Sequence, residues 1–188
     1  MKKLSDEILW KSLKEGDLKA FSVLFNSYYS NLFNYGLKIS KNKSLTEDSL
    51  QDFFLYIYEH RENLSDLDKV SPYLFTSYRR FIIKIIQKNL KTKIVRDIDE
   101  NIVDINFTPE ELITNQESTT FRNTRLTQLL NKLPKRQREV IYLKYNCNLK
   151  TQEISEVMGI NYQSVVNNIH KAIKGLREEI QILQLFNS

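Results

Sequence analysis

Residues 149–178 read LKTQEISEVMGINYQSVVNNIHKAIKGLRE, and the organisation of the C-terminal part of the chain follows from them. The first ten residues predict a short amphipathic helix, Gly159-Ile160-Asn161 a tight turn, and residues 162–178 a longer helix. Gly159 suits the turn because glycine adopts a positive φ without steric cost. Ser155, four residues earlier, is small enough to let the two helices cross closely. The pattern is that of a helix-turn-helix, whose second helix enters the major groove of DNA.

The two predicted helices have an apolar side and a polar side. The apolar residues that would pack between them are Ile154, Met158, Ile160, Val165 and Ile169. Asn and Gln side chains can pair with adenine edges, and Lys171, Lys174 and Arg177 can meet phosphates. The residues of the second helix that we expect to be exposed are Asn161, Gln163, Ser164, Asn167, Asn168 and Lys171. An ordinary helical hairpin is the alternative that this pattern leaves open.

Two further helices are predicted upstream, from Phe121 to Leu133 and from Pro134 to about Tyr145. Cys147 lies in the connection that follows and is the chain's single cysteine. It cannot form an internal disulfide, which fits a reducing compartment. Because no nearby His or second Cys would activate the thiol, we do not expect a reactive cysteine.

The N-terminal part begins with a predicted helix for which Ser5 is the N-cap. A second helix starts at about Asp17, and its apolar residues recur at three- and four-residue intervals, which predicts a buried face. The residues of this stripe are Leu18, Phe21, Phe25, Tyr28, Tyr29 and Leu32.

Ser44-Leu45-Thr46-Glu47 fits a capping box at the start of a third helix. Its buried stripe would be Leu50, Phe53, Phe54, Ile57 and Tyr58. Asp48, Asp52, Tyr56 and Glu59 point elsewhere and make a polar, partly acidic face. Such a face suits a protein partner better than DNA, although a plain solvated face is the alternative.

Residues 63–71 predict a loop, and Ser71-Pro72 predicts the N-cap and first position of a helix that runs to about Leu90. Its inward residues would be Leu74, Tyr78, Phe81, Ile82, Ile85 and Ile86. Its basic residues are Arg79, Arg80, Lys84, Lys88 and Lys91. Cations alternating with aromatic rings suit single-stranded DNA, where bases stack and phosphates pair. An ordinary basic helix surface is the alternative.

Charge divides the chain into three parts. The net charge is +5 overall, with +4 over residues 1–92, −5 over 93–118 and +6 over 119–188. The acidic part has no sustained periodicity and predicts a flexible linker. With only four Gly and three Pro among 188 residues, we expect an all-α fold of two small helical domains joined by this acidic linker, the C-terminal one containing the helix-turn-helix.

Several functional classes are excluded by the sequence. The N-terminus turns acidic before any apolar run, so it predicts no signal peptide, and no stretch approaches the roughly 18 apolar residues of a membrane span. The two histidines, His60 and His170, lie far apart. We find no metal-ligand cluster, glycine-rich phosphate loop or serine nucleophile motif, and predict no enzyme, no catalytic residue, no metal and no cofactor.

Both basic parts carry motifs of one family. Residues 47–59, EDSLQDFFLYIYE, match its acidic pair, Leu, Gln-Asp and aromatic residues, and residues 133–140, LPKRQREV, match its Leu-Pro-x-x-x-Arg-x-Val signature. Gln152-Glu153-Ile154-Ser155, Ser164-Val165 through Ala172, and Leu176-Arg177 follow in the family's order. Over nearly its full length the chain resembles the extracytoplasmic-function (ECF) sigma factors, the smallest members of the sigma-70 family.

The resemblance implies a bacterial transcription initiation factor that binds core RNA polymerase and recognises the −10 and −35 promoter elements. Residues 1–92 resemble region 2, whose third helix contacts the polymerase beta-prime coiled coil. The core-binding residues implied are Asp48, Gln51, Asp52, Leu55, Tyr56 and Glu59. The loop at 63–71 and the next helix resemble the segment that captures melted −10 bases. The residues implied there are Asn63, Ser65, Asp66, Lys69, Tyr73, Arg79, Arg80 and Lys84.

Residues 119–188 resemble region 4, which reads the −35 element and docks on the beta flap. The −35 residues implied are Lys150, Thr151, Asn161, Gln163, Ser164, Asn167, Asn168 and Lys171. The linker at 93–118 resembles the one that threads through the polymerase. The family also implies an anti-sigma factor as partner, promoter DNA and no small-molecule substrate, and a cytoplasmic location in which the anti-sigma factor holds the protein at the inner membrane.

The chain departs from the family at positions that bear on specificity. Arg80 stands where the family commonly has Asn, Cys147-Asn148 where it often has Glu-Gly, and Val166 and Asn168 where it often has basic residues. Promoter preference therefore cannot be carried over from the family. The alternative function is a helix-turn-helix regulator that acts without core polymerase. The motif at 47–59 argues against it, because such a regulator would not need that helix.

Overall fold

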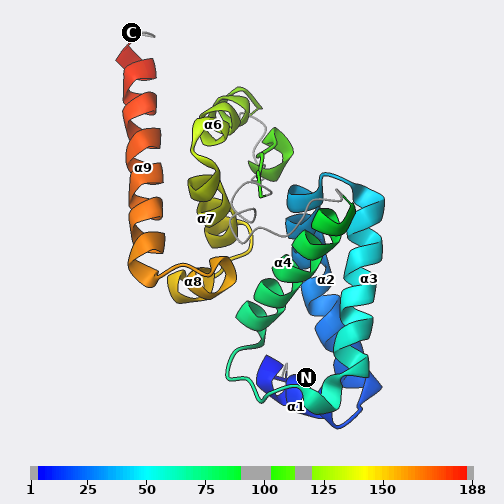
Figure 1. Ribbon diagram of the computed structural model, residues 1–188. Helices are drawn as coiled ribbons and strands as arrows, with labels where there is room; N and C mark the ends of the chain where they lie inside the picture. The colour runs from blue at the N-terminus through cyan, green and yellow to red at the C-terminus, as the bar shows by residue number, and fades with distance from the viewer. Residues whose placement is uncertain (1–3, 90–102, 113–119, 186–188) are drawn as a thin grey trace. The chain divides into compact units, whose positions relative to one another are not determined.

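The computed structural model describes residues 4–89, 103–112 and 120–185, and every regular element in these ranges is helical (Figure 1). The predicted all-α class is confirmed. The chain divides into two compact units, an N-terminal one that contains α1–α4 and a C-terminal one that contains α6, α7, α9 and the first part of α8. No helix in the described ranges combines the length and apolar character that a membrane span requires.

The N-terminal unit consists of α1 (Asp6–Lys14), α2 (Leu18–Ser40), α3 (Lys43–Glu59) and α4 (Val70–Asn89), with a 3-10 turn, η1 (Arg61–Asn63), after α3. The long α2 packs against α1, α3 and α4. Each helix contributes one apolar side to a common core. Its most deeply buried residues include Trp10, Leu24, Leu32, Tyr35, Leu50, Ile57, Leu74, Tyr78 and Ile82.

Two caps of this unit differ in how well the sequence predicted them. Asp17 caps α2 by accepting hydrogen bonds from the backbone N–H of Lys19 (2.8 Å) and Ala20 (3.4 Å). The predicted capping box at Ser44 is wrong, because α3 starts earlier and Asn42 caps it, with its side-chain oxygen accepting from Leu45 N–H at 3.1 Å. Asn and Ser are comparable N-caps, so both patterns were compatible with the sequence.

The buried face of α2 also differs from the predicted stripe. Leu18 is 62% exposed, and Phe21, Phe25 and Tyr29 are half-buried. Tyr28 and Leu32 of the predicted stripe are buried, and the buried line continues through Ala20, Leu24, Tyr35 and Ile39. The aromatic residues beside it pack sideways on α3, with ring centroids of Phe25 and Phe54 4.8 Å apart. α4 begins at Val70, two residues before Pro72, the predicted first helical position.

Gly36 of α2 lies directly against the side chain of Tyr78 of α4. A Cβ at this position would collide with the ring and hydroxyl of Tyr78. The Tyr78 hydroxyl lies 3.2 Å from the Ser49 hydroxyl, and burial raises the pKa of Tyr78 to about 12. Glycine therefore allows α2, α3 and α4 to meet around one buried tyrosine.

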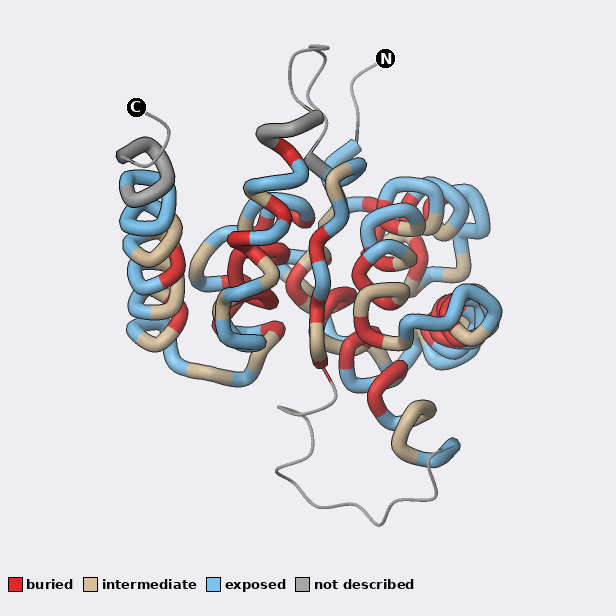
Figure 2. The backbone as a smooth tube through the Cα atoms, turned by 90° about the horizontal axis from the view of Figure 1, so that it is seen from above, coloured by how far each residue is buried: buried red, intermediate tan, exposed pale blue. Residues whose placement is uncertain are grey.

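The C-terminal unit consists of η3 (Pro109–Leu112), α6 (Thr120–Lys132), α7 (Lys135–Tyr145), α8 (Thr151–Met158) and α9 (Tyr162–Leu185). α7 packs along α9 and α6 packs on η3. In Figure 2, α9, which leads to the C-terminus, is buried along one side only. This helix continues past the predicted end at residue 178. The buried residues of the unit include Leu129, Leu130, Val140, Leu143, Ile154, Val165 and Ala172.

Residues 103–112 depart from the predicted linker. Val103, Ile105 and Phe107 are buried, and the Phe107 ring lies 6.1 Å from the ring of Tyr142 on α7. Asn131 of α6 accepts from Phe107 N–H at 2.8 Å and donates to its carbonyl at 3.0 Å. This segment therefore belongs to the C-terminal unit, because its alternating apolar side chains are buried despite its acidic composition. The rest of the predicted linker, residues 93–102 and 113–118, lies outside the described residues.

Candidate nucleic-acid and protein interfaces

The predicted helix-turn-helix is formed by α8, the turn at Gly159 and α9. Gly159 has a φ of +65°, as the turn requires, and Ile160 N–H donates to the carbonyl of Ser155 at 3.1 Å. Ser155 is 5% exposed and Val165 is fully buried. Of the predicted apolar wedge, Ile154 and Val165 are buried, whereas Met158, Ile160 and Ile169 are half-buried.

The start of α8 is fixed by a side chain from its own first turn. The carboxylate of Glu153 accepts from Lys150 N–H at 2.8 Å, which satisfies one of the free donors at the helix start. The side chain of Lys150 is exposed and Thr151 is half-buried. Both therefore remain candidates for contact with the phosphate backbone in front of the helix-turn-helix.

Two asparagines predicted to read bases are engaged with the backbone of α9. Asn161 is its N-cap, with the side-chain oxygen accepting from Ser164 N–H at 2.7 Å. Asn168 donates from its amide to the carbonyl of Ser164 at 2.8 Å and is half-buried. The prediction that Asn168 faces outward is therefore wrong, since its amide folds back on its own helix. Asn161 acts as a cap because it occupies the position where side-chain oxygens meet free N–H groups.

The remaining polar residues of α9 form an exposed pair and a cation. The Gln163 amide donates to the side-chain oxygen of Asn167 at 3.1 Å, and both residues are exposed, as is Lys171. A linked Gln–Asn pair presents one donor and one acceptor edge, the arrangement that adenine recognition uses. Tyr162, which the sequence reasoning missed, is 51% exposed in the first turn of α9. The sequence signal for it was that Tyr162 directly follows the predicted turn and so begins the helix that would enter the major groove.

The outer face of α3 is confirmed as exposed over all six predicted core-binding residues, namely Asp48, Gln51, Asp52, Leu55, Tyr56 and Glu59. Leu55 is 54% and Tyr56 51% exposed, so the face combines carboxylates with large apolar groups. The Tyr56 ring stacks on His60, with centroids 4.1 Å apart. Apolar side chains exposed among polar ones are typical of protein–protein contacts, and His60 is an addition that the prediction missed.

Four of the residues predicted to meet the −10 element are exposed, namely Asn63 at the end of η1 and Ser65, Asp66 and Lys69 in the loop after it. Tyr73 is half-buried, and its ring packs edge-on against Trp10 with centroids 5.2 Å apart. Burial raises the pKa of Tyr73 above its ordinary value.

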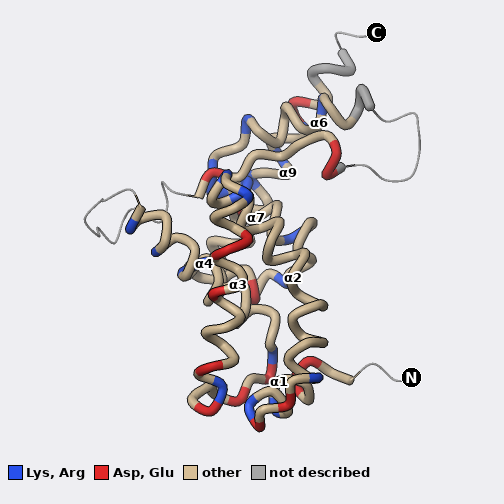
Figure 3. Tube along the Cα trace, turned by 90° about the vertical axis from the view of Figure 1, so that its right-hand side faces the viewer, with Lys and Arg blue, Asp and Glu red and all other residues tan. Residues whose placement is uncertain are grey.

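The basic residues of α4 do not all face solvent. Arg79 is only 7% exposed, which corrects the prediction that it presents its guanidinium to DNA. A residue one helical turn after the buried Phe75 shares its direction, so Arg79 follows the core side of α4. Arg80 and Lys84 are exposed, and the Lys and Arg residues of α4 are marked in Figure 3.

The loop is in contact with α1, which the sequence reasoning did not foresee. The Trp10 indole N–H donates to the carbonyl of Ser65 at 3.1 Å, and the Lys14 ammonium lies 2.5 Å from the Asp66 carboxylate. Lys14 lowers the pKa of Asp66, first by its hydrogen bond and then by its charge. The two partners lie more than fifty residues apart in sequence, and no local pattern reports such a pairing.

Known proteins resemble this chain over most of its length. The family model for "Sigma-70, region 4" matches residues 123–176. The ECF RNA polymerase sigma factor SigM of Bacillus subtilis is 28% identical over 161 residues, 81% of this chain and 92% of that protein. The ECF RNA polymerase sigma factor SigW of the same species is 27% identical over 183 residues, 92% of this chain and 95% of that protein.

Solved structures share the fold. CnrH, determined in complex with the cytosolic domain of CnrY, aligns with a TM-score of 0.62 at 18% identity, over 94% of this chain and 97% of that one. The sigma factor RpoE of Bartonella quintana, determined with the anti-sigma factor NepR, aligns with a TM-score of 0.59 at 16% identity, over 88% of this chain and 99% of that one.

Proposed function

The chain belongs to the ECF group of the sigma-70 family of RNA polymerase sigma factors, and on that premise we propose that it binds core RNA polymerase and directs it to promoters through −10 and −35 recognition. The observation that carries the proposal is that one chain presents both an exposed acidic and apolar face on α3 and a helix-turn-helix. A regulator that binds DNA alone would need only the second of these.

In the N-terminal unit, the outer face of α3 binds the polymerase and the loop after η1 meets melted DNA. Leu55 and Tyr56 supply the apolar centre of the core contact, and Asp48, Asp52 and Glu59 supply charge around it. Single-stranded DNA requires a different surface, with cations for phosphates and polar groups for unpaired bases. This surface is provided by Asn63 at the end of η1, Ser65 and Lys69 in the loop, and Arg80 and Lys84 on α4.

In the C-terminal unit, α9 enters the major groove of the −35 element. Gln163 and Asn167 read base edges, while Lys150 and Lys171 neutralise phosphates. The exposed cations on or before α9 are Lys150, Lys171, Lys174 and Arg177, and with about four phosphate contacts the unit alone binds duplex DNA only weakly. Core polymerase holds the two units at the spacing of the two promoter elements, and two weak contacts then act as one strong contact through their effective concentration.

The same premise extends to partners and location. The solved relatives CnrH and RpoE are each bound to a second protein, for RpoE an anti-sigma factor, and we propose an anti-sigma factor as the inhibitor of this chain, one that holds it at the inner membrane. A factor that works on core polymerase acts in the cytoplasm, without catalytic chemistry of its own.

Run-off transcription tests the proposal. Purified core polymerase, this protein and fragments of its own genome are combined, and transcripts are mapped. Transcripts with defined start sites that require both proteins are the expected result. Promoter DNA binding by the protein alone, with no transcript, would replace the proposal with a regulator that acts without polymerase.

A further inference from the structure

We propose that α1 holds the loop at residues 61–69 in its DNA-binding shape, and that Trp10 and Lys14 are positioning residues for capture of the −10 element. The inference rests on the proposed function, because it names residues that act on the same site without touching DNA. It concerns a part of the N-terminal unit that the sequence motifs leave without a role.

The segment needs an external holder. Residues 64–69 form neither helix nor strand, so their conformation is not fixed by a backbone ladder. A loop that samples many conformations must lose that freedom when it binds, which weakens binding. Preorganising it in the bound shape removes this loss.

Trp10 contacts both the middle of the loop and the first turn of α4. Its side chain is 1% exposed, and its indole N–H donates to the carbonyl of Ser65 at 3.1 Å. The same ring packs edge-on against Tyr73 at the start of α4, 5.2 Å between centroids. A buried indole N–H requires an acceptor, so the Ser65 carbonyl is fixed inward and its side chain is left exposed.

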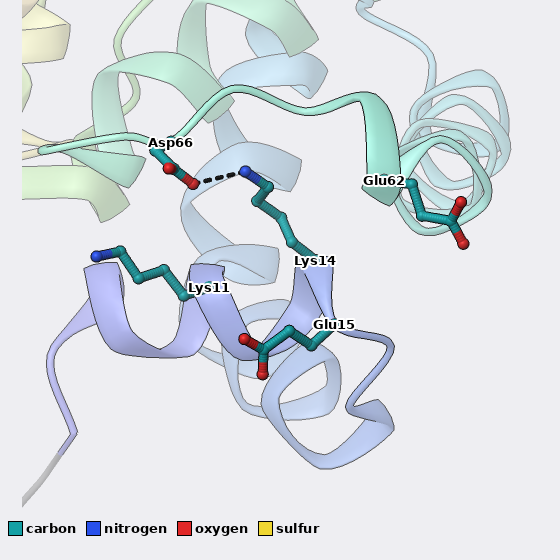
Figure 4. Close-up of a pocket in the computed structure, with 5 residues that line it drawn as sticks. All are labelled: Lys11, Lys14, Glu15, Glu62 and Asp66. Atoms are coloured by element: carbon teal, nitrogen blue, oxygen red, sulfur yellow. Dashed lines mark hydrogen bonds and ion pairs between the residues drawn. The ribbon is translucent and has the colours of Figure 1, made fainter.

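Lys14 holds Asp66, the residue after Ser65 in the loop. Its ammonium lies 2.5 Å from the Asp66 carboxylate, one turn along α1 from Trp10 (Figure 4). The lysine side chain is 22% exposed and the aspartate 73%, so the contact reaches from the body of the unit to the tip of the loop. Between α1 and the loop lies an open hollow of about 470 Å³ lined by Lys11, Lys14, Glu15, Glu62 and Asp66.

The start of the loop has a further contact, with the end of α3. The Arg61 guanidinium donates to the carbonyl of Tyr58 at 2.9 Å and lies over the Tyr58 ring, 4.7 Å from its centroid. The loop is thus fixed at Arg61 and at Ser65 and Asp66, and the hydrogen bond and ion pair at Ser65 and Asp66 both come from α1.

α1 is itself braced against the core. Leu9 and Leu13 are buried, and the Tyr28 hydroxyl of α2 donates to the Asp6 carboxylate. The position of the loop therefore depends on the packing of α1 against α2 and on the side chains of Trp10 and Lys14. If Asp66 acts through Lys14, losing either partner has the same consequence.

The experiment compares full-length Lys14→Gln, Asp66→Asn and the double variant in holoenzyme with core polymerase, on promoters found by run-off transcription. Lys11→Gln is the matched control, because it removes the same charge from the neighbouring exposed lysine. Opening of the −10 element is followed by the fluorescence of 2-aminopurine, and discrimination by the ratio of opening on the promoter and on single-base −10 variants.

We expect Lys14→Gln and Asp66→Asn each to reduce opening by about two- to fivefold, and to lower the discrimination ratio. A merely destabilised fold would reduce all promoters equally and leave that ratio unchanged. The double variant should be no worse than either single one, because both remove one shared contact. Lys11→Gln should match the wild type.

A second readout follows the loop without DNA. Trp10 is the only tryptophan of the chain, so its fluorescence and the hydrogen exchange of residues 64–69 report the anchor directly. We expect faster exchange there in Lys14→Gln and in Trp10→Phe. Wild-type exchange in both, or a defect in Asp66→Asn that Lys14→Gln lacks, would overturn the inference. Silent wild-type holoenzyme would instead overturn the proposed function, and the positioning role with it.

Discussion

Arg138 shows how one side chain can define the edge of a unit. Its guanidinium donates to Asn106 at 2.8 Å and to the Asn131 carbonyl at 3.2 Å, and it also pairs with Asp104. The arginine is 8% exposed. It therefore joins α7 to the acidic segment before η3 and to the end of α6.

We expect Arg138→Met to lower the free energy of unfolding of the C-terminal unit by about 1–3 kcal/mol, because it removes the charged donor that the Asp104 carboxylate, the exposed Asn106 side chain and the carbonyl of the half-buried Asn131 share. The exposed Arg136 on the same helix gives the control, and Arg136→Met should cost less than about 0.5 kcal/mol. Urea denaturation of both variants measures the difference. Equal stability of the two would show that the arginine does not hold the segment.

Cys147 is a structural residue. Its side chain is 8% exposed, and burial raises the pKa of its thiol from 9.0 to about 12. At pH 8 the thiolate, which is the reactive form, is nearly absent from the folded state. We expect Ellman's reagent to label the native protein far more slowly than the urea-unfolded one. Rapid labelling of the native protein at pH 8 would contradict this burial.

The same shift affects stability at high pH. A thiol that ionises at about 9 when unfolded and at about 12 when folded favours the unfolded state as pH rises between these values. The Tyr142 hydroxyl beside it, whose pKa is also raised by burial, acts in the same direction. Chemical denaturation at pH 7 and pH 10 should show a lower free energy of unfolding at pH 10. Stability that is equal or greater at pH 10 would show that these groups do not govern it.

Among the elements, helix existence was predictable from apolar periodicity, and helix phase and caps were less so. On α2 apolar residues occur on most sides, so periodicity alone could not decide between Phe21 and Leu24 as the inward residue. At α3, Asn42 and Ser44 are both good N-caps. Local sequence therefore could not show that the helix begins after Asn42. The contacts of Trp10 with Ser65 and of Arg138 with Asp104 join residues more than thirty positions apart, and their partners could not be read from local sequence.

The first turn of α9 separates two roles that asparagine can have. Asn161→Ala removes the N-cap and should lower the free energy of unfolding by about 1 kcal/mol. Asn167→Ala alters only an exposed side chain and its partner Gln163, so stability should change by less than about 0.5 kcal/mol. Thermal denaturation measures both.

In promoter selection, Asn167→Ala should have the larger effect of the two. Asn167→Ala should change the relative use of −35 variants, because a base contact of this kind is worth about 1–3 kcal/mol of discrimination. Asn161→Ala should reduce all of them alike. If Asn167→Ala leaves every −35 variant in its wild-type order, then α9 does not read bases through this pair.

At the scale of the whole molecule, the surfaces fall into those that attach the protein to polymerase and those that select DNA. Changes to the first should scale all promoters by one factor, whereas changes to the second should alter the ratio between promoters. On the proposed function, the α3 face is of the first kind, and the loop at residues 64–69 and the exposed Gln163–Asn167 pair on α9 are of the second. This difference gives each surface a separate signature in one transcription assay.

Asp52→Ala with Tyr56→Ala tests the first kind. Both residues are exposed on α3, so the melting temperature should stay near that of the wild type, while affinity for core polymerase should fall by at least about tenfold, since few residues carry most of an interface's binding energy. Competition with labelled wild-type protein for core measures the affinity. On a panel of promoters at limiting core, transcription should fall by one common factor and recover at saturating protein. A change in promoter order would mean that this face takes part in DNA selection, and unchanged affinity would mean that core binds elsewhere on the chain.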